Sequence, residues 1–183
     1  GKVGLKAEGL VGPFENSLDE QIDHILIKGH ALNLAEFVPS APQTDLDFDA
    51  TIVPSPQKGL ALEGSIDLTN SLAAPADQNG IPVRSILGEF TVGDSGILKV
   101  HDVTATLLEE GALILGGETD TDKNTFALEA ILKNASLSDF VSQKYDDVFE
   151  GSLLLNGTYR EPQAKWDIRG NRAGSTGELA IAN

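Results

Sequence analysis

Apolar and polar residues alternate along most of this chain. In residues 60–68, LALEGSIDL, leucine or isoleucine stands at every second position except one, and small or acidic residues lie between. Residues 46–52, 126–132 and 151–155 repeat this alternation. Side chains of a β-strand point alternately to its two faces, so the pattern predicts half-buried strands with one apolar and one polar face. The pattern shows no helical crossovers, which favours antiparallel pairing.

The alternation and the turn residues between the alternating segments predict an all-β fold with few or no helices. We expect short helical turns at residues 34–38 and 137–144, and a bend at Gly29 within the second strand. The expected strands are 3–11, 18–34, 45–53, 59–69, 83–92, 97–109, 111–119, 124–134, 147–159, 164–170 and 176–181.

Two parts of the sequence, at about residues 34–64 and 137–170, resemble each other. Each begins with the pattern Leu-x-acid-Phe-Val, as LAEFV in the first and LSDFV in the second. Each later contains Pro-Gln followed by an alternating strand that ends in glycine. Repetition of this kind favours an elongated architecture in which neighbouring units bury each other's apolar faces, and it argues against a compact enzyme.

Composition limits the classes of partner and chemistry. The 183 residues carry a formal net charge of −15, which repels phosphate backbones and makes nucleic acid an unsuitable partner. Cysteine is absent, so disulfides, thiolate metal sites and thiol nucleophiles are excluded. No apolar run approaches the ~18 residues of a membrane span. Methionine is also absent, and the last residues fall inside an expected strand, so we expect a single β-rich segment, 1–183, of a longer protein.

Three aspartates at two-residue spacing raise the question of calcium binding. Asp45, Asp47 and Asp49 match the first ligand positions of an EF-hand loop. That loop also needs glycine at its sixth position and glutamate at its twelfth, where this chain has Ala50 and Pro56. We therefore interpret the aspartates as the polar face of a strand, and we expect no metal and no cofactor.

Other polar segments are also better explained by structure than by chemistry. Residues 120–125, DTDKNT, depart from the calcium-loop pattern and predict a hairpin turn. Residues 93–96, GDSG, resemble the nucleophile segment of chymotrypsin-like serine proteases, but Ile97 stands where that family has a glycine. A tight hairpin turn is the simpler interpretation. The three histidines show no spacing typical of a zinc site, and no catalytic residue is predicted.

The apolar strand face is the candidate binding surface. Three hypotheses remain open at this point: an open apolar groove for acyl chains or a partner strand, a closed β-sandwich or β-solenoid adhesion module with these residues as core, and a carbohydrate-active β-solenoid enzyme. The expected groove-lining residues are Leu46, Phe48, Ile52, Leu60, Leu62, Ile66, Leu68, Phe90, Phe126, Leu128, Leu153, Leu155, Tyr159, Trp166 and Ile168.

Residues 149–168, FEGSLLLNGTYREPQAKWDI, resemble a repeat of the TamB/AsmA-like family, whose pattern is roughly G-x-L-x-L-x-G-T followed by proline and a second alternating strand. Residues 81–118 share the family's rhythm of apolar pairs and single glycines, and residues 135–141, ASLSDFV, resemble its short link between sheets. The resemblance covers most of the chain, and residues 18–30 fit it least well.

The resemblance implies a β-taco, which is an elongated, curved antiparallel sheet folded over a hydrophobic groove. It implies a non-enzymatic periplasmic segment of an inner-membrane-anchored protein of a Gram-negative bacterium. Such proteins, as part of a translocation and assembly module, act with an Omp85-family outer-membrane partner in outer-membrane biogenesis and autotransporter secretion, and they take part in lipid transport. The implied ligands are phospholipid or outer-membrane protein β-strands.

Overall fold

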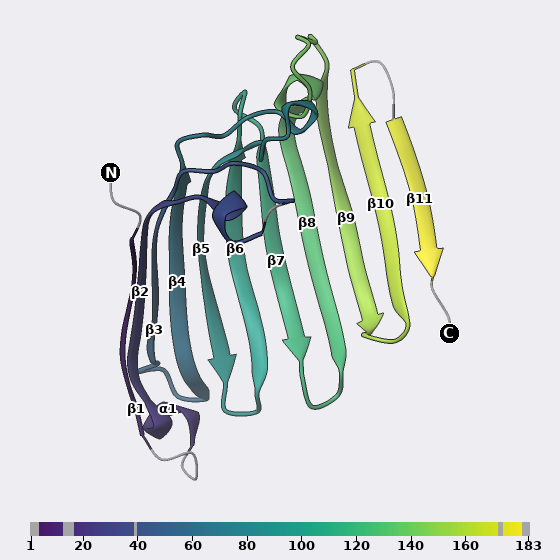
Figure 1. Cartoon of the computed structure of the whole chain (residues 1–183). Coiled ribbons are helices and arrows are strands. Elements are labelled where there is room, and N and C mark those ends of the chain that lie inside the picture. The colour runs from purple at the N-terminus through teal and green to yellow at the C-terminus, as the bar shows by residue number, and fades with distance from the viewer. Residues whose placement is uncertain (1–3, 13–16, 39, 172–173, 181–183) are drawn as a thin grey trace.

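The chain folds as a single antiparallel sheet. The computed structural model describes residues 4–12, 17–38, 40–171 and 174–180. Within them, 11 strands lie side by side in the order in which they occur in the sequence, from β1 to β11 (Figure 1). Every pairing between neighbouring strands is antiparallel, and β1 and β11 form the two edges. The prediction of an all-β, antiparallel sheet is confirmed, and the sheet is open.

The strands are 7 to 12 residues long, and their connections range from tight hairpin turns to longer segments such as residues 71–82. Their bounds are β1 Gly4–Val11, β2 Ile22–Leu32, β3 Leu46–Pro54, β4 Leu60–Asn70, β5 Val83–Gly93, β6 Ile97–Leu107, β7 Ala112–Asp120, β8 Thr125–Ser136, β9 Val148–Thr158, β10 Pro162–Gly170 and β11 Gly174–Ala180. The helical segments are α1 Leu18–Gln21, η1 Leu34–Glu36, η2 Ala76–Gln78 and η3 Leu137–Asp139.

The strands follow the predicted alternation, with differences at the connections. Residues 18–21 were expected to begin the second strand but form one helical turn, and β2 starts at Ile22. The expected helical segment 137–144 is shorter, because η3 ends at Asp139. Residues 3 and 181, the outer positions of the first and last expected strands, lie outside the described residues.

The two Leu-x-acid-Phe-Val motifs adopt the same local conformation. In η1 the Phe37 N–H donates to the Leu34 carbonyl at 3.0 Å, and in η3 the Phe140 N–H donates to the Leu137 carbonyl at 3.0 Å. The residue before each turn, Asn33 or Ser136, accepts a backbone N–H through its side chain and so caps the turn. The local sequence repeat therefore corresponds to a repeated turn at the end of a strand.

The sheet bends at its N-terminal side and is largely a single layer. In Figure 1, β5 to β11 are seen face-on, whereas β1 to β3 at the left are seen nearly edge-on. The short helix α1 contacts β3 and β4 as well as β2. The described strands do not form the two facing sheets of a closed sandwich. Apolar side chains that are buried within the described residues are few: Leu32, Ala61, Leu62, Leu107 and Ala135.

Candidate functional site

One face of the sheet is largely apolar from β1 to β10. Strand register places a single row of residues side by side across all 11 strands. This row is Leu5, Gly29, Phe48, Leu68, Ile86, Ala105, Leu113, Leu132, Gly151, Ile168 and Ser175. From Leu5 to Ile168 each member of this row is apolar or glycine. We call the face that carries this row the apolar face, and the opposite side the polar face.

The structure brings most of the predicted residues together on the apolar face. Those related to the row by strand alternation and register are Leu46, Phe48, Ile52, Leu62, Ile66, Leu68, Phe90, Phe126, Leu128, Leu153, Leu155, Trp166 and Ile168. Leu62 is buried, whereas the other twelve are half-buried and keep part of their surface exposed. The described strands form one sheet, and no second sheet faces this side.

Leu60 departs from the expected placement. The register of β4 against β5 shifts between Leu60 and Leu62, as at a β-bulge, so the alternation reverses at Ala61. Leu60 therefore lines a depression on the polar face together with Val53 and Glu63. Strict alternation in the sequence gives no sign of this reversal.

Tyr159 lies beyond the end of β9 but still joins the apolar face. Its ring stacks on Phe126, with centroids 5.7 Å apart and an angle of 22° between the ring planes. Its hydroxyl group is hydrogen-bonded to the Thr119 hydroxyl. The contact extends the apolar surface to the end of the β9–β10 hairpin, where Tyr159 is 54% exposed.

Several apolar-face residues were missing from the prediction, although the same alternation carried the signal. They are Ile25, Ile27, Ile86, Val92, Leu98, Val100, Val103, Leu113, Leu115, Leu132 and Phe149. The register joins them into the same surface as the predicted residues, so the apolar face is wider than the predicted set.

Aromatic residues of the apolar face lie opposite glycines on neighbouring strands. The register pairs Gly29 with Phe48, Gly64 with Phe90, Phe126 with Gly157, Phe149 with Gly170, and Trp166 with Gly177. A Cβ built on Gly29, Gly64 or Gly177 would overlap the ring of its partner. The rings therefore lie over the glycine backbone, in the space that a side chain at these positions would occupy.

A methyl group at one of these glycines is expected to destabilise the sheet. Gly64→Ala places its Cβ within the Phe90 ring and 2.8 Å from the Thr51 carbonyl oxygen, so we expect a loss of about 1–3 kcal/mol in the free energy of unfolding. Urea unfolding measures this loss. Gly4→Ala is the control, because nothing lies within 4 Å of its added methyl group. A smaller side chain in the double variant Gly64→Ala, Phe90→Leu should restore part of the stability, and equal stability of the two glycine variants would contradict the packing.

The polar face carries exposed cross-strand contacts. The Lys28 ammonium lies 2.7 Å from the Asp49 carboxylate on the neighbouring strand. Asp47 accepts from the Ala31 N–H at 2.9 Å and contacts the His30 ring at 2.6 Å, and these hydrogen bonds lower the pKa of Asp47. The alternating aspartates therefore serve the solvent-facing side of β3. Exposed pairs of this kind contribute little stability individually.

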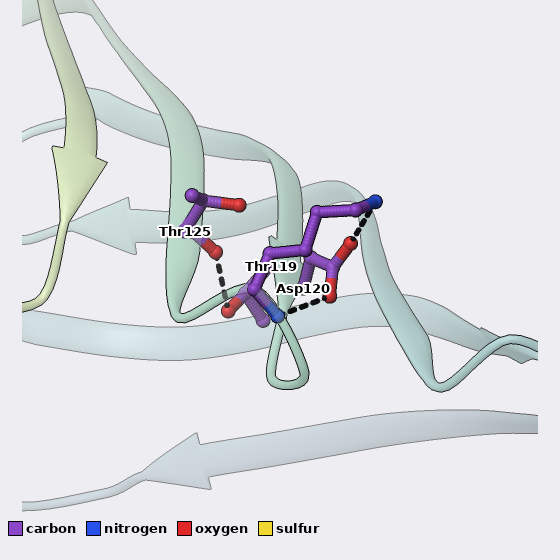
Figure 2. Close-up of polar contacts among 4 residues, drawn as sticks. Thr119, Asp120 and Thr125 are labelled. Carbon is purple, nitrogen blue, oxygen red and sulfur yellow. Dashed lines mark hydrogen bonds and ion pairs between the residues drawn. The ribbon is translucent and has the colours of Figure 1, made fainter.

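The segments considered for catalysis and for calcium binding, residues 93–96 and 120–125, form hairpin turns. Residues 93–96 connect β5 to β6, with the Gly96 N–H donating to the Gly93 carbonyl at 2.9 Å. Residues 120–125 connect β7 to β8. The Asp120 carboxylate accepts from the backbone N–H and from the side-chain ammonium of Lys123, and the Thr119 hydroxyl donates to the Thr125 carbonyl (Figure 2). The hydrogen bond from the Lys123 side chain lowers the pKa of Asp120. Both turn predictions are confirmed.

The histidines pair with single neighbours. His24 contacts Asp23 at 2.7 Å, although adjacent residues of a regular strand point to opposite faces. A register shift between β1 and β2 leaves Asp23 outside the regular pairing and explains the difference. His101 contacts the Thr91 hydroxyl at 2.9 Å. Among the described residues, no group of three or more His, Asp or Glu side chains is placed to hold a metal ion.

Shallow depressions lie on the polar face. One of about 690 Å³ lies across β3 to β6 and includes Glu63, Glu89, Lys99 and His101 in its lining. The apolar face, in contrast, is a broad wall and is the candidate binding surface. The described helices contain no segment long and apolar enough to cross a membrane.

Comparisons with protein-family models, curated proteins and solved structures found no match. The resemblance to the TamB/AsmA-like family therefore stays a prediction from the sequence.

Proposed function

We propose that this chain is a non-enzymatic segment of an envelope-spanning protein, and that its apolar face shields phospholipid acyl chains from water during transport across the periplasm. The observation that supports this is the apolar row that crosses the sheet while staying half-exposed along the middle of the strands. A monomeric protein rarely leaves so large an apolar surface open unless a ligand or partner covers it. In this proposal the bent sheet is folded over into a β-taco, and the apolar face is the wall of its groove.

The chemistry of the wall suits a flexible apolar chain better than a ligand with a fixed shape. Burial of one methylene group is worth about 0.8 kcal/mol, so roughly six methylenes on the wall would be held by about 5 kcal/mol. The rings that lie over Gly29, Gly64 and Gly177 remove steps that would obstruct a sliding chain. Because no single residue dominates, an acyl chain can be retained and still move along the surface.

Outer-membrane protein β-strands are a second candidate cargo, and the sheet edges favour it. Every described residue of β1 is exposed, and on its outer side no described strand pairs with it. Such an edge can accept a further strand through its free backbone groups. In either case the parent protein would be anchored in the inner membrane and would act with an Omp85-family partner in outer-membrane assembly.

Quenching of tryptophan fluorescence tests acyl-chain binding directly. Trp166 is the single tryptophan of the chain and lies half-buried on the apolar face, between Leu153 and Gly177 in the register. Titration with dibromostearic acid should quench its emission, because bromine quenches at contact distance, whereas stearic acid should not. Dodecanol has an alkyl chain but no carboxylate, so its competition with dibromostearic acid separates binding of the chain from binding of the headgroup. Absence of quenching at saturating concentrations below the critical micelle concentration would contradict the proposal.

A further inference from the structure

The connection between β4 and β5 forms a long excursion that we call the strap, residues 71–82. Within the strap the Ala74 N–H donates to the Ile81 carbonyl at 3.2 Å, and the Gly80 N–H donates to the Pro75 carbonyl at 3.1 Å. The two legs therefore run together like a hairpin, and η2 forms the tip. In Figure 1 the strap crosses the upper ends of β5 to β7 and reaches the connection between β8 and β9.

The base of the strap is firmly anchored. Asn70, the last residue of β4, is buried and belongs to the apolar face through its pairing with Leu46. Its side-chain oxygen accepts from the Leu72 N–H at 3.2 Å, and its side-chain nitrogen donates to the Val83 carbonyl at 3.2 Å. Both ends of the strap thus attach to one buried amide.

The tip of the strap is held by a separate set of exposed hydrogen bonds, which we call the latch. The Ser142 N–H donates to both carboxylate oxygens of Asp77 at 2.9 Å, and the Ser142 hydroxyl donates to one of them at 2.7 Å. The Ala76 N–H donates to the Phe140 carbonyl at 2.9 Å. The bonds from Ser142 lower the pKa of Asp77, so its carboxylate is charged in neutral solution. Asp77 and Ser142 are both exposed to water.

The strap lies beside a covered end of the apolar face, where Gly111 of the β6–β7 connection also packs against Leu107 and Ala135. Leu107 at the end of β6 and Ala135 near the end of β8 are 3% and 1% exposed, whereas apolar-face residues in the middle of the same strands are half-exposed. These two residues occupy the strand ends that the strap spans between its base and its latch. An anchored base, a water-exposed latch and a covered apolar end are together the arrangement of a movable lid.

We propose that the strap is a gate at this end of the apolar face: latched by Asp77 and Ser142 it closes the end, and released it opens a route for an acyl chain. The gate rests on the proposed acyl-chain function and adds a control point to it. The tip can leave the latch because water can replace its exposed hydrogen bonds. The buried base keeps the strap attached to the sheet, so this movement does not require the sheet to unfold.

A reversible disulfide tests the gate in one protein. The chain has no cysteine, so the double variant Asp77→Cys, Ser142→Cys introduces a single pair at side chains that touch in the latch. Oxidation locks the strap, and reduction leaves it without the Asp77–Ser142 bonds of the latch. Dibromostearic acid is bound first, and its release is followed by recovery of Trp166 fluorescence after dilution into excess vesicles of phosphatidylcholine. We expect release from the reduced form to be at least about tenfold faster than from the oxidised form.

A conservative variant and the pattern of outcomes keep the two proposals separate. Asp77→Asn retains the shape of the latch but loses its charge, and its release rate should lie between those of the locked and reduced forms. The wild-type chain has no cysteine, so its release rate should be the same after treatment with the oxidant and with the reductant. Binding with equal release rates from the oxidised and reduced forms would overturn the gate alone. Absence of binding to every form, wild type included, would overturn the proposed function and the gate with it.

Discussion

Arginine in place of Leu153 is expected to weaken acyl-chain binding by about 10- to 100-fold, because a guanidinium group on the wall would have to lose water whenever a chain covers it. Leu153 lies in the middle of β9 on the apolar face, where the register places it between Ala130 and Trp166. It is half-buried, so the arginine can extend into solvent in the unliganded sheet. The cost therefore falls on binding and much less on folding.

The neighbouring residue provides the matched control. Ser152 precedes Leu153 on the same strand, faces the polar side and pairs with Asp167, so Ser152→Arg adds the same charge without touching the wall. Its affinity for dibromostearic acid should equal that of the wild type. Circular dichroism and urea unfolding establish that both variants are folded. A folded Leu153→Arg variant that binds as tightly as Ser152→Arg would exclude the apolar face as the binding surface.

Alternation was a reliable guide to this fold because little else competes with it. In a single-layer sheet whose strands pair with their sequence neighbours, each strand's two faces are set by its own pattern, and no long-range crossover has to be guessed. The strand that contains Leu60, Leu62, Ile66 and Leu68 illustrates both success and failure. Its apolar face follows the sequence from Leu62 onward, whereas the bulge at Ala61 turns Leu60 to the other side.

Features that depend on register or on distant loops were not predictable from the sequence. The overlap of a Gly64 Cβ with the Phe90 ring requires the alignment of β4 with β5. The latch joins Asp77 to Ser142, 65 positions apart, and neither residue stands in a motif. The sequence repeat did mark the loop that receives the strap, because the second Leu-x-acid-Phe-Val motif contains the carbonyl of Phe140 that binds Ala76.

The acidic residue of that second motif has a structural role that its counterpart lacks. Asp139 is 0% exposed, and its two carboxylate oxygens accept from the Glu109 N–H at 2.6 Å and the Ser136 N–H at 2.7 Å. The second of these bonds completes a capping box around η3. The first ties the β6–β7 connection to the β8–β9 connection. In the first motif, Glu36 is exposed, and the Thr44 hydroxyl accepts the Leu34 N–H instead.

Asp139→Ala is therefore expected to lower the free energy of unfolding by about 2–4 kcal/mol, because it leaves two backbone N–H groups without their acceptor at a buried position. Urea unfolding followed by Trp166 fluorescence measures the change. Asp139→Asn keeps one acceptor oxygen and should lose about half as much. Asp146→Ala, which removes an exposed carboxylate from the same connection, should stay within about 0.5 kcal/mol of the wild type. If Asp139→Ala were as stable as Asp146→Ala, the carboxylate could not be what joins these connections, and the loop that receives the strap would have to be held in place by the apolar contacts of Leu107 and Ala135.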